Sequence, residues 1–178
     1  MEGERKIVIY CSASYDIDPK FNQAAREVAR AACSLGYTIV SGGAVKGTMG
    51  ALADEIARCG GRHIGVQPRF MDEYKFPGLD HVLFTETLAE RKERMREGTC
   101  AAIALPGGIG TLDELIGTLT LAKLGQYAGK IYALNLDGFY TPLIALLDDH
   151  VARGMLDRRD RSLIEFPDTV GELVGHLD

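Results

Sequence analysis

The chain has 178 residues, of which 46% are hydrophobic and 25% are charged, values typical of a soluble globular protein. Its net charge of −5 argues against duplex nucleic acid as a partner, because surfaces that follow a phosphate backbone are usually basic. That charge is still compatible with a single nucleotide held in a local pocket. The length favours one domain over residues 1–178, with a core of its own.

The first residues, the length of the apolar runs and the spacing of cysteines and histidines indicate the compartment and the absence of a metal site. The first residues, M-E-G-E-R-K, show no signal-peptide pattern, and no apolar run approaches the ~20 residues that span a bilayer. The four cysteines are widely spaced without a C-x-x-C pair, and the four histidines are scattered. We therefore expect a cytoplasmic protein with reduced thiols, no membrane association, no cofactor and no structural or catalytic metal.

Strand-like and helix-like patterns alternate along the chain. In the first half we expect strands at 6–13, 37–41, 63–68 and 81–86, a helix from 19 to about 35, a helix from the glycine-rich segment 42–50 to about 59, and an irregular loop at 69–80. In the second half we expect helices at 87–98, 111–124 and 141–153, strands at 100–105, 130–136 and 163–166, and a short terminal helix. The long loop is of a length that often carries function.

Four residues predict where helices begin and end. Asp18 and Pro19 supply an N-cap and a first-turn proline for the first helix, and Gly36 is suited to end it. Asp168 is the expected cap of the terminal helix. Strands that alternate with helices in this way indicate a Rossmann-like three-layer α/β fold with a mainly parallel sheet. Ligands of such sheets bind at the carboxyl ends of the strands.

Two glycine-rich segments fall at predicted carboxyl ends of strands, each followed by a helix. They are S-G-G-A-V-K-G-T-M-G (41–50) and P-G-G-I-G-T (106–111). Glycines of this kind can serve a tight turn alone, or can let a phosphate approach the backbone N–H groups of a helix N-terminus. Neither segment matches the G-x-G-x-x-G or G-x-x-x-x-G-K-[ST] motif, so a mononucleotide or a sugar phosphate fits better than NAD or motor-type ATP chemistry.

Charged residues beside the second glycine segment allow a structural and a chemical reading. Asp113 and Glu114 could complement the helix dipole, or a carboxylate could bind ribose hydroxyls and stabilise an oxocarbenium-like transition state. The basic helix E-R-K-E-R-M-R-E (90–97) could be a solvated face, or an arginine near its start could clamp a phosphate.

Together these motifs resemble the Lonely Guy family, the cytokinin-activating phosphoribohydrolases long labelled lysine decarboxylase-like. P-G-G-I-G-T-L-D-E (106–114) is similar to the family's P-G-G-x-G-T-x-x-E signature, and E-R-K (90–92) matches a family element at the same spacing. C-S-A-S after the first strand, the segment 41–50 and the proline after H-I-G-V extend the resemblance over most of the chain. Ala44, Thr48 and the pair Leu88-Ala89 depart from the family pattern.

The resemblance implies an activity and a set of site residues. The implied reaction is hydrolysis of the N-glycosidic bond of a nucleoside 5′-monophosphate, a cytokinin riboside monophosphate or AMP, to free base and ribose 5-phosphate. Arg91 and Glu114 would be the catalytic pair. The implied substrate-binding residues are Gly42, Gly43, Arg91, Lys92, Gly107, Gly108, Gly110, Thr111 and Thr120. The resemblance also implies a homodimer.

Two other classes of function stay open at this point. The chain could be a nucleotide-binding carrier or sensor module without catalysis, in which both glycine segments serve binding alone. It could also be a pyridoxal-phosphate decarboxylase, as the older family label suggests, and such an enzyme needs a Schiff-base lysine. Lys46, Lys92 and Lys123 are present, but none lies in a recognisable pyridoxal context.

Overall fold

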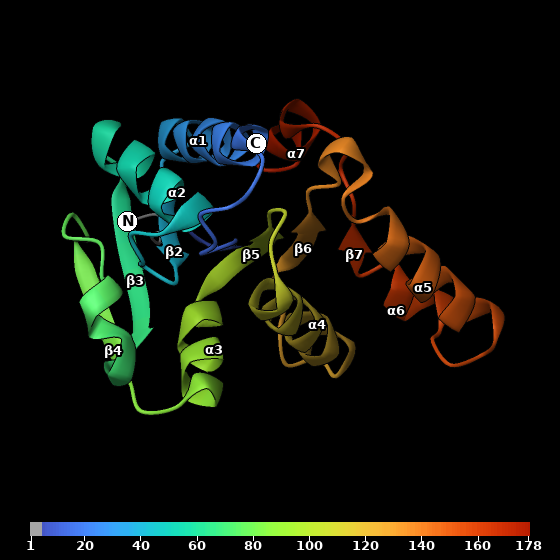
Figure 1. Cartoon of the computed structure of the whole chain (residues 1–178). Coiled ribbons are helices and arrows are strands. Elements are labelled where there is room, and N and C mark those ends of the chain that lie inside the picture. The colour runs from blue at the N-terminus through green and yellow to red at the C-terminus, as the bar shows by residue number, and fades with distance from the viewer. Residues whose placement is uncertain (1–4) are drawn as a thin grey trace.

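The computed structural model describes residues 5–178, which form seven strands in one sheet with helices on both faces (Figure 1). The strands are β1 (Lys6–Tyr10), β2 (Thr38–Ser41), β3 (Arg62–Pro68), β4 (His81–Thr85), β5 (Thr99–Ala104), β6 (Lys130–Ala133) and β7 (Ile164–Glu165). Every neighbouring pair of strands is parallel. The predicted Rossmann-like three-layer α/β fold is confirmed. The expectation of one domain stays a prediction, and residues 1–4 of its range lie outside the described part.

The strand order places a crevice at the middle of the sheet. The order is β4-β3-β2-β1-β5-β6-β7, so the chain builds outward from β1 in one direction and then returns to add β5, β6 and β7 on the other side. The connections after β1 and after β5 therefore diverge to opposite sides. In an open parallel sheet this reversal leaves a crevice at the carboxyl ends of the two strands, which is where ligands bind.

Two sets of helices cover the two faces of the sheet. The first set is α1 (Pro19–Ser34), α2 (Gly47–Arg58) and α7 (Val170–Gly175), and the second is α3 (Leu88–Arg96), α4 (Ile109–Lys123) and α5 (Thr141–Ala152). The strand β1 shows why both faces are apolar: Ile7 and Ile9 pack under the first set, whereas Val8 and Tyr10 pack under the second. Successive side chains of a strand point to opposite faces, so a strand buried on both sides reads as a continuous apolar run.

The helix signals at the start of the chain are confirmed. The Asp18 side chain accepts a hydrogen bond from the Lys20 N–H at 3.0 Å, and Pro19 occupies the first turn of α1. Gly36 follows the helix with a φ of 76°, a left-handed conformation that a side chain would oppose. These short-range signals worked because each cap depends only on residues next to it in the chain.

Three expectations need correction. Asp168 is not the cap of the terminal helix: Thr169 caps it by accepting from the Glu172 N–H, while the Asp168 carboxylate accepts from Asn135 at 2.9 Å. The loop at 69–80 is not wholly irregular, since Arg69–Tyr74 forms a 3-10 helix. Two further short helices, η2 (Leu136–Gly138) and α6 (Arg158–Arg161), carry no apolar periodicity and were not expected.

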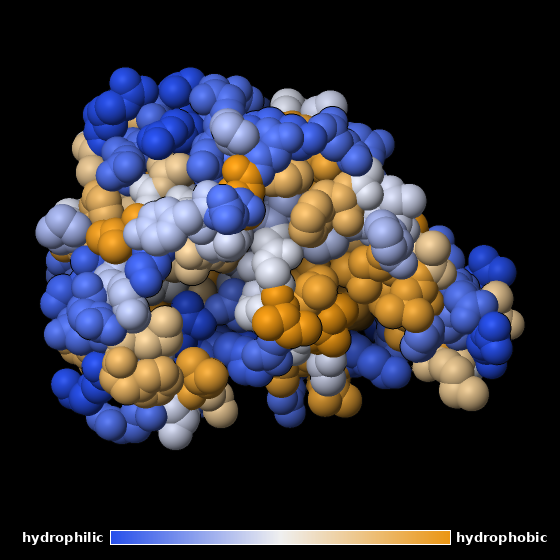
Figure 2. Space-filling model, viewed as in Figure 1, coloured by the Kyte–Doolittle hydropathy of each residue, from blue (hydrophilic) through white to orange (hydrophobic). Residues whose placement is uncertain are grey.

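Exposed apolar side chains gather over α4 and α5, as the orange areas of Figure 2 show, and they include Ile116, Leu124 and Leu146. A single chain does not test the expected homodimer, which stays a prediction. No helix within residues 5–178 is long and apolar enough to cross a membrane. All four cysteines are free thiols.

A buried histidine joins β2 to β3 below the crevice. His63 is 1% exposed, its Nε2 lies 2.8 Å from the Ser41 hydroxyl, and its backbone N–H donates to the Asp80 carboxylate at 2.7 Å. Burial lowers the pKa of His63 to about 4, although the nearby Asp80 opposes this shift. The imidazole is therefore neutral in the folded protein at neutral pH.

We expect His63 to make folding pH-dependent between about pH 6.5 and 4. In this window His63 is protonated in the unfolded chain but stays neutral in the folded protein, so stability falls as the pH falls. Between these pH values, the free energy of unfolding of the parent should fall by about 3 kcal/mol more than that of His63→Gln. The glutamine cannot titrate, and it keeps an amide donor for Ser41. Urea unfolding at several pH values measures the difference, and identical pH dependence in the two proteins would contradict the expectation.

Candidate active site

A cavity of about 360 Å³ lies at the carboxyl ends of the central strands. Its walls come from the segments that follow β1 (residues 11–14), β2 (42–49) and β5 (108–114), from the end of β3 and the start of the next segment (67–71), and from Leu88 and Arg91 of α3. It therefore occupies the crevice that the strand order predicts. Both glycine-rich segments meet here, together with the basic helix α3 and the helix α4 that carries Asp113 and Glu114.

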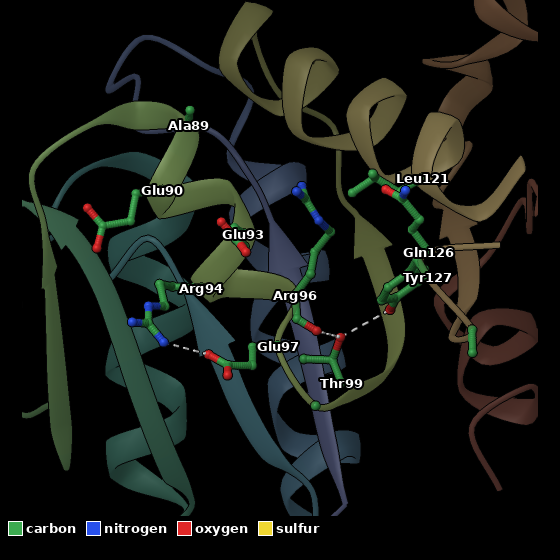
Figure 3. Close-up of a pocket in the computed structure, with 12 residues that line it drawn as sticks. Ala89, Glu90, Glu93, Arg94, Arg96, Glu97, Thr99, Leu121, Gln126 and Tyr127 are labelled. Carbon is green, nitrogen blue, oxygen red and sulfur yellow. Dashed lines mark hydrogen bonds and ion pairs between the residues drawn. The ribbon is translucent and has the colours of Figure 1, made fainter. Parts of the chain in front are cut away.

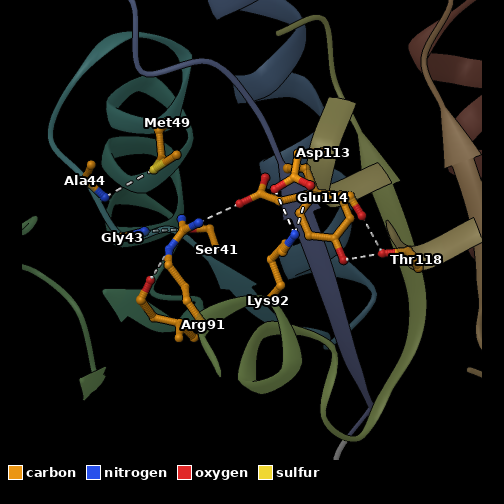
Figure 4. Close-up of polar contacts among 11 residues, drawn as sticks. Ser41, Gly43, Ala44, Met49, Arg91, Lys92, Asp113, Glu114 and Thr118 are labelled. Atoms are coloured by element: carbon orange, nitrogen blue, oxygen red, sulfur yellow. Dashed lines mark hydrogen bonds and ion pairs between the residues drawn. The ribbon is translucent and has the colours of Figure 1, made fainter. Parts of the chain in front are cut away.

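A buried ion pair forms the polar centre of this cavity. Arg91 Nη1 donates to Glu114 Oε1 at 2.6 Å, and Arg91 Nε donates to the Val66 carbonyl oxygen at 3.0 Å (Figure 4). The two side chains are only 15% and 8% exposed. Within residues 5–178, Arg91 Nη2 and Glu114 Oε2 make no hydrogen bond to the chain. Each partner of the pair thus keeps polar atoms available to a ligand.

Burial and charge act in opposite directions on Glu114. Loss of water around the carboxylate raises the pKa of Glu114, and the adjacent Arg91 guanidinium lowers it without cancelling the rise. The net pKa lies above the ordinary glutamate value. A carboxylate with a raised pKa is a stronger base than a solvated one, which suits it to accept a proton from water or a hydroxyl group.

A second ion pair lies beside the first and joins the same two helices. Lys92 Nζ donates to both carboxylate oxygens of Asp113, at 2.8 and 2.9 Å. Asp113 is 59% exposed, so this outer pair adds little stability on its own. Its position along α3 and α4 holds the two helices in the register that brings Arg91 against Glu114. Asp113 therefore takes part in the ion pair that joins α3 to α4, and it does not line the cavity.

A buried hydroxyl network supports the turn of α4 that carries Glu114. Thr118 Oγ1 donates to the Glu114 carbonyl oxygen at 2.7 Å and lies 2.9 Å from the Tyr10 hydroxyl on β1. Thr118 is fully buried, and Tyr10 is 1% exposed. Sequence reasoning missed both residues. The signal was a tyrosine inside an apolar strand, since a buried tyrosine hydroxyl usually finds a partner.

The second glycine segment forms an open N-terminus of α4. Gly108 is the N-cap residue, and no side chain caps the helix. A Cβ added at Gly108 or Gly110 would meet no atom within 4 Å, and neither residue has a positive φ. Gly107 differs, because a Cβ there would lie 2.8 Å from Thr111 Cβ. The fold thus requires a glycine at 107, whereas the missing side chains at 108 and 110 leave free space at the cavity.

The first glycine segment has less to offer a ligand. The Gly43 N–H donates to Ser41 Oγ at 3.0 Å, the Ala44 N–H points at Met49 Sδ, and the Met49 N–H donates to the Ser12 carbonyl oxygen at 2.9 Å. Gly42 lines the cavity, and a Cβ there would collide with the Arg91 guanidinium. This segment makes room for Arg91 while its own N–H groups are used within the chain.

Six of the predicted site residues line the cavity around the ion pair, and four lie outside its wall. Those that line the cavity are Gly42, Arg91, Gly108, Gly110, Thr111 and the second catalytic candidate, Glu114. Gly43, Lys92, Gly107 and Thr120 do not line it. Thr120 is exposed, and its hydroxyl donates to the Ile116 carbonyl oxygen at 2.8 Å within α4. Their predicted roles in substrate binding stay predictions.

A larger cavity of about 740 Å³ lies elsewhere, between α3, the start of β5 and the segment after α4 (Figure 3). Its wall includes the Arg94–Glu97 ion pair at 3.0 Å and Thr99, whose hydroxyl lies 3.1 Å from that of Tyr127. Thr99 is the first residue of β5, so this cavity sits at the amino end of the strand. It contains none of the predicted site residues, and we assign the site to the smaller cavity.

Comparison with known proteins identifies the family. The family described as possible lysine decarboxylase matches residues 49–177. The cytokinin riboside 5′-monophosphate phosphoribohydrolase LOG of Oryza sativa subsp. japonica is 35% identical over 98% of this chain and 73% of its own length. LOG3 of Arabidopsis thaliana, which bears the same enzyme name, is 33% identical over 98% of this chain and 82% of its own length. This chain belongs to the Lonely Guy family.

Solved structures share the fold at lower identity. The molybdenum cofactor binding protein of Rippkaea orientalis is 17% identical with a TM-score of 0.77, over 99% of this chain and 97% of its own. The molybdenum cofactor carrier protein of Chlamydomonas reinhardtii is 18% identical with a TM-score of 0.75, over 98% and 96%. At such identities the likeness concerns the arrangement of the sheet and helices. The Lonely Guy assignment rests on the sequence relatives.

We expect Arg91→Met to destabilise the protein in a pH-dependent way. Without Arg91 the buried Glu114 carboxylate lacks its partner, so its pKa rises further above the unfolded value. Stability is then retained at low pH and lost as the pH rises through the folded-state pKa. The loss should reach about 3–5 kcal/mol at pH 8 and be smaller at pH 5.

The double variant Arg91→Met/Glu114→Gln is the control, because it leaves no buried charge. Chemical denaturation at the two pH values should show that it recovers most of the stability lost at pH 8. Equal destabilisation by Arg91→Met at both pH values would mean that the unpaired carboxylate is not the cause.

Proposed function

We propose that this protein hydrolyses the N-glycosidic bond of a nucleoside 5′-monophosphate, giving a free base and ribose 5-phosphate. The observation that carries the proposal is the buried Arg91–Glu114 pair beside an open glycine turn in one cavity. Phosphate binding alone does not require a buried carboxylate, which repels an anion. A reaction that develops positive charge on a sugar does benefit from one.

The glycine turn supplies the phosphate end of the proposed site. The N-terminus of α4 carries a partial positive charge and N–H groups without a capping side chain. Gly108 and Gly110 leave space for phosphate oxygens to approach these groups, and Thr111 adds a hydroxyl in the first turn. Glu114 follows three residues after Thr111 on the same helix, so the phosphate and the carboxylate are held at a fixed separation.

Glu114 supplies the chemistry at the sugar. As the bond between C1′ and the base nitrogen breaks, its electrons leave with the base and positive charge builds on the ribose ring. The carboxylate stabilises that charge and accepts a proton from the water whose oxygen bonds to C1′. The departing base takes up a proton, so one water is consumed for each base and ribose 5-phosphate released.

Arg91 holds Glu114 in position and contributes its own free donors. Its Nε and Nη1 are fixed by Val66 and Glu114, which leaves Nη2 to bind a substrate oxygen or the leaving base. Lys92 acts indirectly, because its ion pair with Asp113 aligns α3 with α4 and so positions Arg91 against Glu114. Binding energy from the phosphate end is thereby used to place the sugar against Glu114.

The relatives' names indicate candidate substrates. Cytokinin riboside 5′-monophosphates are the substrates named for LOG and LOG3, and AMP has the same phosphate, ribose and purine frame. We propose both as substrates, in a cytoplasmic homodimer. A carrier or sensor that binds nucleotides without cleaving them is the alternative, and base release separates it from the enzyme.

Pyridoxal-phosphate chemistry does not fit the residues present. None of the described residues that line the cavity is a lysine. Lys46 Nζ lies over the Tyr74 ring, Lys92 binds Asp113, and Lys123 lies 3.3 Å from Asp160. A Schiff base needs a lysine amine that can reach the cofactor inside the site. We derive no decarboxylase step.

Glu114→Gln should lower base release from AMP and from isopentenyladenosine monophosphate by about 10²–10⁴-fold, because the amide neither stabilises positive charge nor accepts a proton. Nucleotide binding should change little, since the phosphate contacts remain. Arg91→Ala should weaken both binding and turnover. Chromatographic separation of free base from nucleotide measures the rates, and calorimetry with Glu114→Gln measures binding. Turnover by Glu114→Gln at the parent's rate would refute the assignment.

Two glycines of α4 separate phosphate binding from stability. Gly110→Ala should raise KM for AMP about tenfold by blocking the phosphate, while its thermal stability stays at or slightly above the parent's. Gly117→Ala is the matched control, since a Cβ at Gly117 also meets no atom within 4 Å but lies outside the cavity. It should keep the parent's KM. Equal KM values for the two variants would count against a phosphate at the glycine turn.

A further inference from the structure

One buried polar atom beside the cavity has no partner within residues 5–178. Gln67, the last residue but one of β3, lines the cavity and is 2% exposed. Its Nε2 donates to the Gly43 carbonyl oxygen at 3.1 Å, whereas its Oε1 is buried without any hydrogen bond. An unpaired buried acceptor is unfavourable for folding. The catalytic chemistry proposed for Arg91 and Glu114 does not use it.

The orientation of the Gln67 amide is fixed by its neighbour. Gly43 contributes a carbonyl oxygen, which can only accept, so the amide nitrogen must face it and the amide oxygen must face away. The same carbonyl oxygen also accepts from the Phe76 N–H at 2.8 Å, which ties the segment after the 3-10 helix to this point. Gln67 therefore presents an acceptor, and not a donor, to anything that approaches its free end.

The sheet places this acceptor at the end of the cavity opposite the glycine turn. Gln67 lies near the carboxyl end of β3 and the glycine turn follows β5, with β2 and β1 between the two strands. Three strand spacings separate the two points by about 14 Å. Arg91 bridges the gap, because it binds the carbonyl oxygen of Val66, the residue before Gln67, and also binds Glu114. A nucleotide with its phosphate at the turn and its sugar at Glu114 would direct its base toward Gln67.

The surroundings of Gln67 suit a flat apolar ring. Pro68, Met71 and Leu88 line the cavity beside it, and Met71 and Leu88 are 38% and 55% exposed. Flexible, partly exposed side chains of this kind can move to admit a ring and bring a donor to the covered Oε1. Among apolar groups, the amide oxygen is then a discriminating contact, because a ligand without a donor would leave it unpaired.

We propose that Gln67 is a specificity-determining residue that accepts a hydrogen bond from an amino group on the leaving base, a deduction that rests on the proposed function. For a purine this selects an exocyclic 6-amino group. An N6-substituted adenine keeps one N–H and is accepted. A purine with a 6-oxo group, or with hydrogen at C6, offers no donor there and is disfavoured.

Binding measured in the Glu114→Gln background tests the proposal without interference from turnover. Calorimetry compares AMP with purine riboside 5′-monophosphate, which lacks only the 6-amino group, and with inosine 5′-monophosphate. AMP should bind on the order of 10–100-fold more tightly than either. Adding Gln67→Met, a change of similar size, should bring the ratio to within about threefold of unity. Adding Gln126→Met instead, the same exchange at an exposed glutamine outside this cavity, should leave the ratio unchanged.

The outcomes separate this proposal from the proposed function. Equal affinity for AMP and purine riboside 5′-monophosphate overturns the role of Gln67, and it does so even if Gln67→Met fails to fold. A preference that survives Gln67→Met also overturns it. Base release from AMP by the parent protein tests hydrolysis separately. A binding preference that depends on Gln67, without any base release, would support the recognition step and refute the enzyme.

Discussion

The structure around the site depends on burying one ion pair between two helices. Removing two charges from water is costly, and the cost is offset only when geometry and further hydrogen bonds are good. The chain meets this condition with contributions from several elements: the Val66 carbonyl oxygen binds Arg91, Gly42 leaves space for its guanidinium, and Thr118 anchors the backbone of Glu114. The pKa of Glu114 is still raised. In the proposed mechanism, this remaining cost of ionisation makes the carboxylate a better proton acceptor.

The two glycine segments perform different tasks although their sequences look alike. In the first, the N–H groups are bonded to Ser41, Met49 and Ser12, and its glycines permit close packing. In the second, the helix N-terminus is uncapped and the glycines at 108 and 110 face open space. Composition does not distinguish these cases, because glycine serves both tight turns and ligand approach. The hydrogen-bond partners of the N–H groups do distinguish them, and these partners depend on how the folded segment packs.

The sequence predicted the fold well because the signals were local or periodic. Apolar strands alternating with capped helices define the sheet, and the motifs placed Arg91 and Glu114 near the starts of two helices, α3 and α4, that meet at the cavity. The prediction failed at Asp168, where Thr169 competes for the same role, and at short helices without periodicity. Gln67 was also missed, since a glutamine at the end of an apolar strand looks ordinary until its unpaired oxygen is seen beside the cavity.

In the proposed enzyme, strand order also separates the residues of catalysis from those of base recognition. In the proposed binding mode, the phosphate lies at the turn after β5, the carboxylate lies one helical turn later, and the base lies against β3 and the segment after it. Changes around Gln67, Met71 and Leu88 can therefore alter which base is accepted while the Arg91–Glu114 pair stays intact. The pair touches β3 only through the main-chain oxygen of Val66, which any side chain at that position would supply. If the proposed function holds, this arrangement allows the Arg91–Glu114 pair to be combined with different base pockets in related chains.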